Sequence, residues 1–188
     1  MVQIEKVAVI GAGTMGAQIA SLTALSGYTV SLWDGFDAAL ANGMERAERD
    51  IFPNLGERRQ IDAATVASGL ARLSAAGSMA EAVDGAGLVI EAVREEIGVK
   101  REVFSELSRL TPAILGTNSS SIPSSLIAPA VERPERLLNM HFFAPIWVRS
   151  MLELMTCGET SEETLQSAFE FGVSLGLVTA IVNGESKG

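Results

Sequence analysis

One stretch of the chain decides its fold: Val7-Ala8-Val9-Ile10-Gly11-Ala12-Gly13-Thr14-Met15-Gly16. Its apolar first part suits a strand covered on both faces, and the glycines suit a tight turn that opens a helix. Gly11 would take the turn, Gly13 would let backbone approach a phosphate, and Gly16 would let the helix lie close against the strand. Backbone N–H groups and the positive end of the helix dipole then face one point. The pattern predicts a site for the pyrophosphate of a dinucleotide.

Asp34 supports this prediction. Tyr28–Trp33 has the composition of a second strand, so that strand, helix and strand follow one another as a βαβ unit requires. Asp34 comes directly after it, eighteen positions past Gly16, close to the ~20 typical of the acid that binds the adenosine ribose. A carboxylate there repels a 2′-phosphate, and no Arg or Lys follows nearby to bind one. The sequence therefore favours NAD over NADP, while a flavin or methyl-donor enzyme remains an alternative with the same local geometry.

The segment 37–69 predicts a helical hairpin inserted after the second strand. Asp37–Asp50 carries alanines and alternating charge typical of a helix, which Pro53 and Gly56 are expected to break. Asp62 is a suitable N-cap for a second helix that ends near position 69. Four arginines of the segment would form either a solvated face or a patch for an anionic group: Arg46, Arg49, Arg58 and Arg59.

Strand and helix patterns alternate through the rest of the chain. Strands are expected at Leu70–Ser74, Leu88–Val93, Ala113–Thr117, Arg136–His141, Met151–Thr156 and Leu177–Val182, and helices at Ser78–Val83, Glu95–Leu110, Pro123–Ala128 and Ser161–Leu175. This alternation predicts an α/β fold, a doubly wound, mostly parallel sheet of the Rossmann type. Ligands of such sheets bind at the carboxyl ends of the strands. We therefore expect Asp34, Val93, Thr117 and His141, which lie at such ends, to come together.

His141, the one histidine of the chain, is the candidate general base. A neutral imidazole accepts a proton near neutral pH, as few other side chains do. Glu153 follows twelve positions later, a separation that suits two antiparallel neighbouring strands. Its carboxylate would then fix the tautomer of the imidazole and stabilise the imidazolium. The alternative is a hydrogen-bonded core histidine beside a surface glutamate.

A polar loop, Asn118-Ser119-Ser120-Ser121, follows another of the predicted strands. Its hydroxyl and amide groups could hold a substrate oxygen or the nicotinamide ribose. The alternative is an ordinary capped loop, because hydroxyl-rich loops are common.

The composition narrows the partners of the protein. A net charge of −9 over 188 residues argues against nucleic acid or an anionic membrane as the main partner, and no apolar stretch suits a membrane span. A single cysteine, Cys157, excludes an internal disulfide, and one cysteine with one histidine predicts no metal site. Strand-like sequence begins by Ile4, so we expect no targeting peptide and a cytoplasmic location.

Four segments together match one known family in order and spacing. They are Val9-Ile10-Gly11-Ala12-Gly13-Thr14-Met15-Gly16, Ile90-Glu91-Ala92-Val93-Arg94-Glu95, Thr117-Asn118-Ser119-Ser120-Ser121, and His141-Phe142-Phe143-Ala144-Pro145 with Leu152-Glu153-Leu154. In these segments the chain resembles the NAD-binding domain of the L-3-hydroxyacyl-CoA dehydrogenases, over essentially all of residues 1–188. The resemblance implies oxidation of the 3-hydroxyl group of an acyl-CoA, or reduction of the 3-keto group, in fatty acid metabolism and β-oxidation.

The resemblance also implies a role for each matching residue. His141 would be the general base, Glu153 would orient it, and Ser120 would hydrogen-bond the substrate oxygen. The hairpin at 37–69 would lie against the CoA moiety. The positions that would bind NAD are Gly11, Gly13, Thr14, Met15, Gly16, Asp34, Ala92, Glu95, Lys100 and Asn118. For Glu95 and Lys100 the alternative is a solvated helix start.

Some residues depart from the family pattern. Ala144 stands where asparagine is frequent, and Ile146–Ser150 differs from the usual apolar residues before the glutamate. A dehydrogenase of a non-CoA 3-hydroxy acid, such as carnitine or a sugar acid, is therefore one alternative, and a non-catalytic NAD-binding module is another. The family continues into a helical domain that completes the substrate site and forms the dimer. We expect that domain to be absent after Gly188, and a homodimer where it is present.

Overall fold

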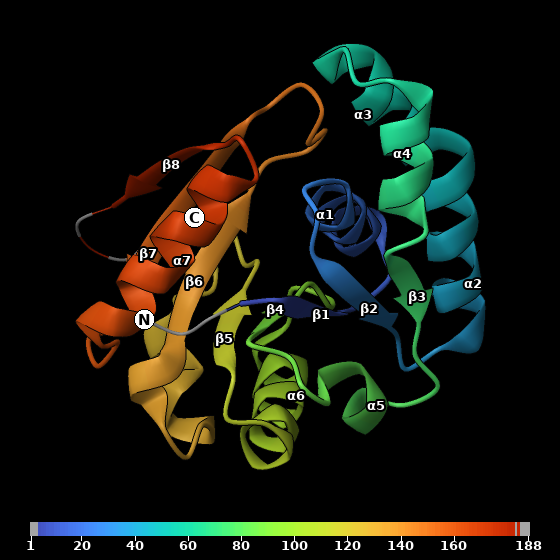
Figure 1. The fold of residues 1–188 in the computed structure, drawn as a ribbon. Coiled ribbons are helices and arrows are strands. Elements are labelled where there is room, and N and C mark those ends of the chain that lie inside the picture. The colour runs from blue at the N-terminus through green and yellow to red at the C-terminus, as the bar shows by residue number, and fades with distance from the viewer. Residues whose placement is uncertain (1–3, 183, 185–188) are drawn as a thin grey trace.

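The strands of the protein form a single sheet (Figure 1). The computed structural model describes residues 4–182 and 184. In this part of the chain the strands are β1 (Lys6–Ile10), β2 (Thr29–Trp33), β3 (Leu73–Ala75), β4 (Leu88–Glu91), β5 (Ile114–Thr117), β6 (Leu137–Phe142), β7 (Met151–Thr156) and β8 (Val178–Ile181). Their order is β3-β2-β1-β4-β5-β6-β7-β8, and all neighbours are parallel except β6 and β7. The predicted α/β fold with a doubly wound, mostly parallel sheet is confirmed.

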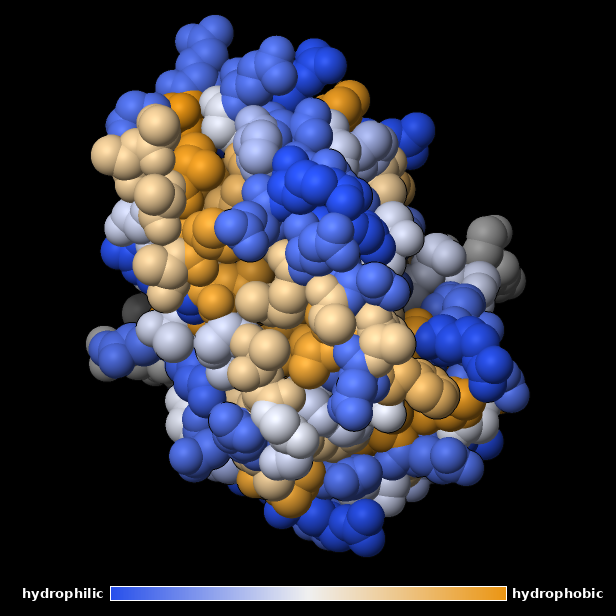
Figure 2. Space-filling view, turned by 90° about the vertical axis from the view of Figure 1, so that its right-hand side faces the viewer, coloured by the Kyte–Doolittle hydropathy of each residue, from blue (hydrophilic) through white to orange (hydrophobic). Residues whose placement is uncertain are grey.

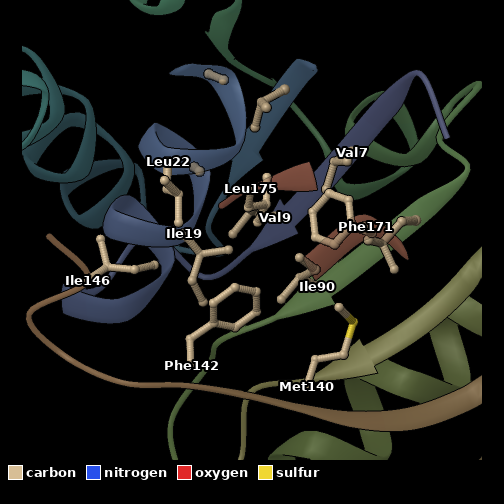
Figure 3. Packing of buried hydrophobic residues seen from close by; sticks show 14 of the residues in the cluster. Val7, Val9, Ile19, Leu22, Ile90, Met140, Phe142, Ile146, Phe171 and Leu175 are labelled. Carbon is tan, nitrogen blue, oxygen red and sulfur yellow. The ribbon is translucent and has the colours of Figure 1, made fainter. Parts of the chain in front are cut away.

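Helices cover both faces of the sheet, because the strands are apolar on both. The longer helices are α1 (Thr14–Leu25), α6 (Ile97–Leu110) and α7 (Glu162–Ser174), with the short α5 (Met79–Val83). In β1, Val7 and Val9 pack in the core beneath α1 and α7, as Figure 3 shows. Ala8 and Ile10 belong to the second core, which α5 and α6 cover. The continuous apolar run of β1 is thus buried on both sides, as the sequence pattern predicts.

The helical hairpin after β2 has the predicted place but a longer first arm. It comprises α2 (Asp37–Arg46), a π-helical turn η1 (Ala47–Ile51), α3 (Phe52–Arg59) and α4 (Ala63–Leu70). The expected helix break at 53–56 is wrong, since the chain stays helical until Gln60, which has φ = +55°. The wide π turn accommodates Pro53, which has no N–H to donate. The Asn54 Nδ2 atom donates to the Asp50 carbonyl at 2.7 Å, so that this acceptor is satisfied.

The arginines of the hairpin make contacts within the protein. Arg49 bonds Glu45 and Asp50 on the exposed surface, and the Arg59 Nη1 atom donates to the Leu175 carbonyl at the end of α7 at 2.8 Å. Figure 2 views the molecule from the side of the hairpin and shows hydrophilic residues interleaved with apolar ones there. For Arg49 these contacts favour the solvated face over an anion patch.

Several other predicted elements differ slightly in extent or type. The strand expected to reach Val93 ends at Glu91, because the Val93 amide donates to the Glu91 carboxylate at 2.7 Å and leaves the ladder. The following helix begins at Ile97 rather than at Glu95. The helix expected at Pro123–Ala128 is a pair of 3₁₀ turns, η2 (Ser124–Leu126) and η3 (Ala128–Ala130). The strand expected to end at Val182 ends at Ile181.

Candidate active site

The glycine turn between β1 and α1 has the shape of an anion cradle. Gly11 has φ = +102°, and a Cβ atom there would lie 2.7 Å from the backbone of Ala92. A Cβ atom on Gly16 would lie 1.7 Å from the Gly11 carbonyl oxygen, so only glycine lets α1 pack this closely. At Gly13, by contrast, a Cβ atom would meet nothing within 4 Å. Space therefore lies open beside the first turn of α1, which carries Thr14 and Met15 and has no side-chain cap.

Asp34 lies at the end of β2, beside this turn. Its carboxylate accepts the Ala12 amide at 2.8 Å and the Phe36 amide at 3.0 Å. A cleft of about 510 Å³ adjoins it and includes Gly13 and Ala92 in its lining. The open cradle at Gly13, the uncapped helix start and a carboxylate at the cleft fit a dinucleotide, with the pyrophosphate at the turn and the ribose near Asp34.

Glu91, Glu95 and Lys100 form a charged group at the end of β4 and the start of α6. The Lys100 Nζ atom lies 2.8 Å and 3.0 Å from the two Glu91 oxygens and 3.3 Å from Glu95 Oε2. The side chains of Lys100 and Glu91 are 0% exposed. The expected alternative of a solvated helix start is therefore wrong for Lys100. Because its ammonium is enclosed by carboxylates, any effect of Lys100 on a cofactor would act through Glu95.

Glu95 organises the polar loop that follows β5. Its Oε1 atom accepts from the Ser119 hydroxyl, from the Ser121 hydroxyl at 2.9 Å, and from the amides of Ser120 and Ser121 at 3.2 Å and 3.0 Å. Partial burial raises the pKa of Glu95, but the hydrogen bonds from Ser119 and Ser121 and the charge of Lys100 outweigh it and lower the pKa to about 2. The loop is therefore held by a carboxylate that stays ionised at neutral pH, and Ser120 lies exposed upon it.

His141 and Glu153 lie opposite each other on β6 and β7, as predicted. The two residues are direct partners in the antiparallel register. The Nδ1 atom of His141 lies 3.2 Å from Glu153 Oε2, and the two side chains are 18% and 30% exposed. Phe143 packs on the imidazole with ring centroids 4.3 Å apart. Both residues are thus partly accessible and paired, unlike a buried core histidine beside a surface glutamate.

Asn118 links the serine loop to the histidine strand. Its Oδ1 atom accepts the amide of Phe142, the residue after His141, at 2.8 Å. The Asn139 Nδ2 atom, on the same strand, donates to the Ser119 carbonyl at 3.0 Å. The structure therefore joins the ends of β4, β5 and β6 through hydrogen bonds.

Two residues of this arrangement, Glu91 and Gln18, have no role in the sequence prediction, and Ser119 has a different partner from the one it suggested. Glu91 is the buried anchor of Lys100, and a carboxylate inside the apolar run Leu88–Val93 was a signal that could have revealed it. Ser119, the innermost serine of its loop, binds Glu95. Gln18 on α1 is buried and accepts the Ile146 amide at 2.9 Å, which positions the loop after His141. No local pattern distinguishes Gln18 from other helix residues.

Residues 4–182 and 184 contain neither a candidate metal site nor a candidate membrane-spanning helix. Among these residues, no group of three or more His, Cys, Asp or Glu side chains lies together in a way that could hold a metal ion. No helix in this part of the chain has the length and apolar character needed to cross a bilayer.

Comparison with known proteins identifies the family. Residues 6–185 match the family described as 3-hydroxyacyl-CoA dehydrogenase, NAD binding domain. The chain is 33% identical to a probable 3-hydroxybutyryl-CoA dehydrogenase of Bacillus subtilis over 96% of the chain and 63% of that protein. The solved (S)-3-hydroxybutyryl-CoA dehydrogenase of Ralstonia eutropha has a TM-score of 0.90 at 29% identity, covering 97% of this chain and 64% of its own. A solved diketoreductase that acts on dicarbonyl compounds has a TM-score of 0.89 at 31% identity, covering 100% of this chain and 67% of its own.

The chain spans about three fifths of the length of most of the curated relatives it matches. The matched part is the cofactor domain, and NAD is the cofactor that the family description gives for it. The glycine cradle, Asp34 and the cleft between them fit that cofactor. The chain belongs to the 3-hydroxyacyl-CoA dehydrogenase family, as its NAD-binding domain.

Proposed function

We propose that this protein acts in the NAD-dependent interconversion of an L-3-hydroxyacyl-CoA and a 3-ketoacyl-CoA. The observation that carries the proposal is the contact of 3.2 Å between His141 and Glu153 at the carboxyl end of the sheet. This is the edge where the glycine turn and Asp34 also lie. A base, an orienting acid and a dinucleotide cradle on one edge are the parts a hydroxyl dehydrogenase needs.

His141 would remove the proton of the substrate hydroxyl. When Glu153 accepts a hydrogen bond from Nδ1–H, the lone pair of the neutral imidazole is on Nε2. The Nε2 atom then takes the proton of the substrate hydroxyl. The Glu153 carboxylate then stabilises the imidazolium that forms. NAD, when bound, supplies the acceptor for the hydride that leaves carbon 3 of the substrate. In the opposite direction, His141 returns the proton to the alkoxide.

Ser120 would donate a hydrogen bond to the substrate oxygen, and Asn118 would keep this loop against the histidine strand. The role of Ser120 rests on the resemblance and on its exposure, and that of Asn118 rests on the hydrogen bond from the Phe142 amide. Of the predicted cofactor residues, the glycines with Thr14, Met15, Asp34 and Ala92 lie around the cradle. Glu95 lies beside the serine loop.

A non-CoA 3-hydroxy or 3-keto compound is the second candidate substrate. The solved diketoreductase shares this fold at 31% identity and acts on dicarbonyl compounds, and Ile146–Ser150 departs from the family pattern beside His141. The relatives named as CoA dehydrogenases favour the first candidate. A homodimer and the cytoplasm remain our proposals for assembly and location.

Because this domain by itself is expected to be poorly active, the test uses the complete polypeptide, as wild type and as His141→Ala. It compares acetoacetyl-CoA with free acetoacetate as acceptors for NADH. We expect wild type to oxidise NADH with acetoacetyl-CoA and not with free acetoacetate. His141→Ala should lose this activity and bind NADH as wild type does. Turnover of the free acid alone would support the second candidate. NADH binding without turnover of either compound would support a non-catalytic module, and equal activity of the two proteins would refute the role of His141.

A further inference from the structure

The side chains of Glu91 and Lys100 form a buried pair at the end of β4 and in the first turns of α6. Each Glu91 oxygen has two donors: Oε1 accepts from Lys100 and the Val93 amide, and Oε2 accepts from Lys100 and the Thr117 hydroxyl. Lys100 has three ammonium protons and three carboxylate oxygens around it. The pair is therefore satisfied in its hydrogen bonds although both side chains are 0% exposed.

Lys100 connects this buried carboxylate to an outer one. Its third contact is Glu95 Oε2 at 3.3 Å, and the Glu95 side chain is 35% exposed. The other oxygen of Glu95 accepts the hydroxyls and amides of the serine loop. One oxygen of Glu95 thus holds the ammonium while the other holds the loop that carries Ser120.

Resting on the proposed function, we propose that Glu91 and Lys100 are positioning residues that fix Glu95 and, through it, the Ser119–Ser121 loop against the substrate. Without the ammonium, Glu95 could turn toward water, because it is partly exposed. The loop has no regular secondary structure and would lose one of its main anchors. A buried ion pair is a poor source of stability compared with a neutral pair of the same shape. Its function here is to direct the outer carboxylate.

The test separates this role from a structural one with the double variant Glu91→Gln/Lys100→Met. Single variants leave a buried group unpaired and should destabilise the protein. The double variant removes both charges together and should recover most of the Tm. Amide hydrogen exchange at Ser120 and Ser121 should nevertheless be faster than in wild type by about tenfold or more, as expected for loss of a hydrogen bond to a charged group. Amides of β4 and β5 should exchange at the wild-type rate.

Glu95→Gln provides a second measurement, because its partly exposed side chain can change without loss of the fold. The same two amides should exchange faster in it. Glu135→Gln, which alters an exposed pair with Arg133, is the matched control and should leave the loop unchanged.

Wild-type exchange at Ser120 and Ser121 in either the double variant or Glu95→Gln would overturn the proposal. Exchange is measured without substrate or cofactor, so this outcome is independent of whether the proposed reaction occurs. Where turnover is present, kcat of the double variant should fall about tenfold or more.

Discussion

Glu153→Gln tests the proposed orienting role of Glu153, because it removes the charge of the side chain and keeps its shape. Glutamine keeps an oxygen that can accept a hydrogen bond from Nδ1–H of His141, so the tautomer is kept and only the negative charge is lost. Two unit charges at the observed 3.2 Å attract each other by about 2.6 kcal/mol at an effective dielectric constant of about 40. That constant lies between about 20 near a protein surface and about 80 in water, as suits side chains that are 18% and 30% exposed.

This energy predicts a loss of about 10²-fold in kcat, because each 1.36 kcal/mol is tenfold in rate. The charge acts on the imidazolium that forms as the proton moves, so binding of NADH should not change. The assay is the initial rate of NADH oxidation with acetoacetyl-CoA, together with a titration of NADH binding. Glu159→Gln, an exposed carboxylate on the turn before α7, is the matched control and should have the wild-type rate. A kcat of Glu153→Gln within threefold of wild type would refute the electrostatic role of Glu153.

Three further predictions concern the cofactor side of the site. Gly16→Ala should abolish NAD binding and lower the Tm, because the added Cβ would lie 1.7 Å from the Gly11 carbonyl oxygen; a variant that binds NAD normally in a titration would contradict the close packing. Asp34→Asn should raise the Kd for NAD about tenfold or more and reduce the preference for NAD over NADP, and parallel titrations with both nucleotides check this. Glu95 has a pKa lowered from 4.5 to about 2, so its ionised form stabilises the fold fully above about pH 4.5, and this stabilisation is lost as the pH falls toward 2. Denaturant unfolding of wild type and Glu95→Gln should therefore differ most at neutral pH and converge in acid; a difference that stays constant down to pH 2 would contradict the assignment.

Local sequence patterns were sufficient to predict much of the fold. The apolar run of β1, the glycine spacing and Asp34 predicted the first βαβ unit, because each of these features acts over a few neighbouring residues. The twelve-residue separation of His141 and Glu153 predicted their pairing, since two antiparallel strands joined by a connection place such residues opposite each other. The structure confirms that register.

The prediction failed where a distant or compensating contact decides the outcome. Pro53 is expected to break the helix, but it lies in the first turn of α3, directly after a π turn, and the chain stays helical. For Lys100 the alternative of a solvated helix start is wrong, because Glu91 and Glu95 hold its ammonium in the interior.

The sequence by itself thus determined the α/β class, the dinucleotide cradle and the pairing of His141 with Glu153, because these depend on short spacings and on residue chemistry. Only the tertiary structure decided how the ends of β4, β5 and β6 are tied together. The contacts of Glu95 with Ser119 and of Asn118 with Phe142 each join residues 24 positions apart. Such pairs leave no periodic signal in the chain, since they exist only once the sheet has brought its carboxyl ends to one edge.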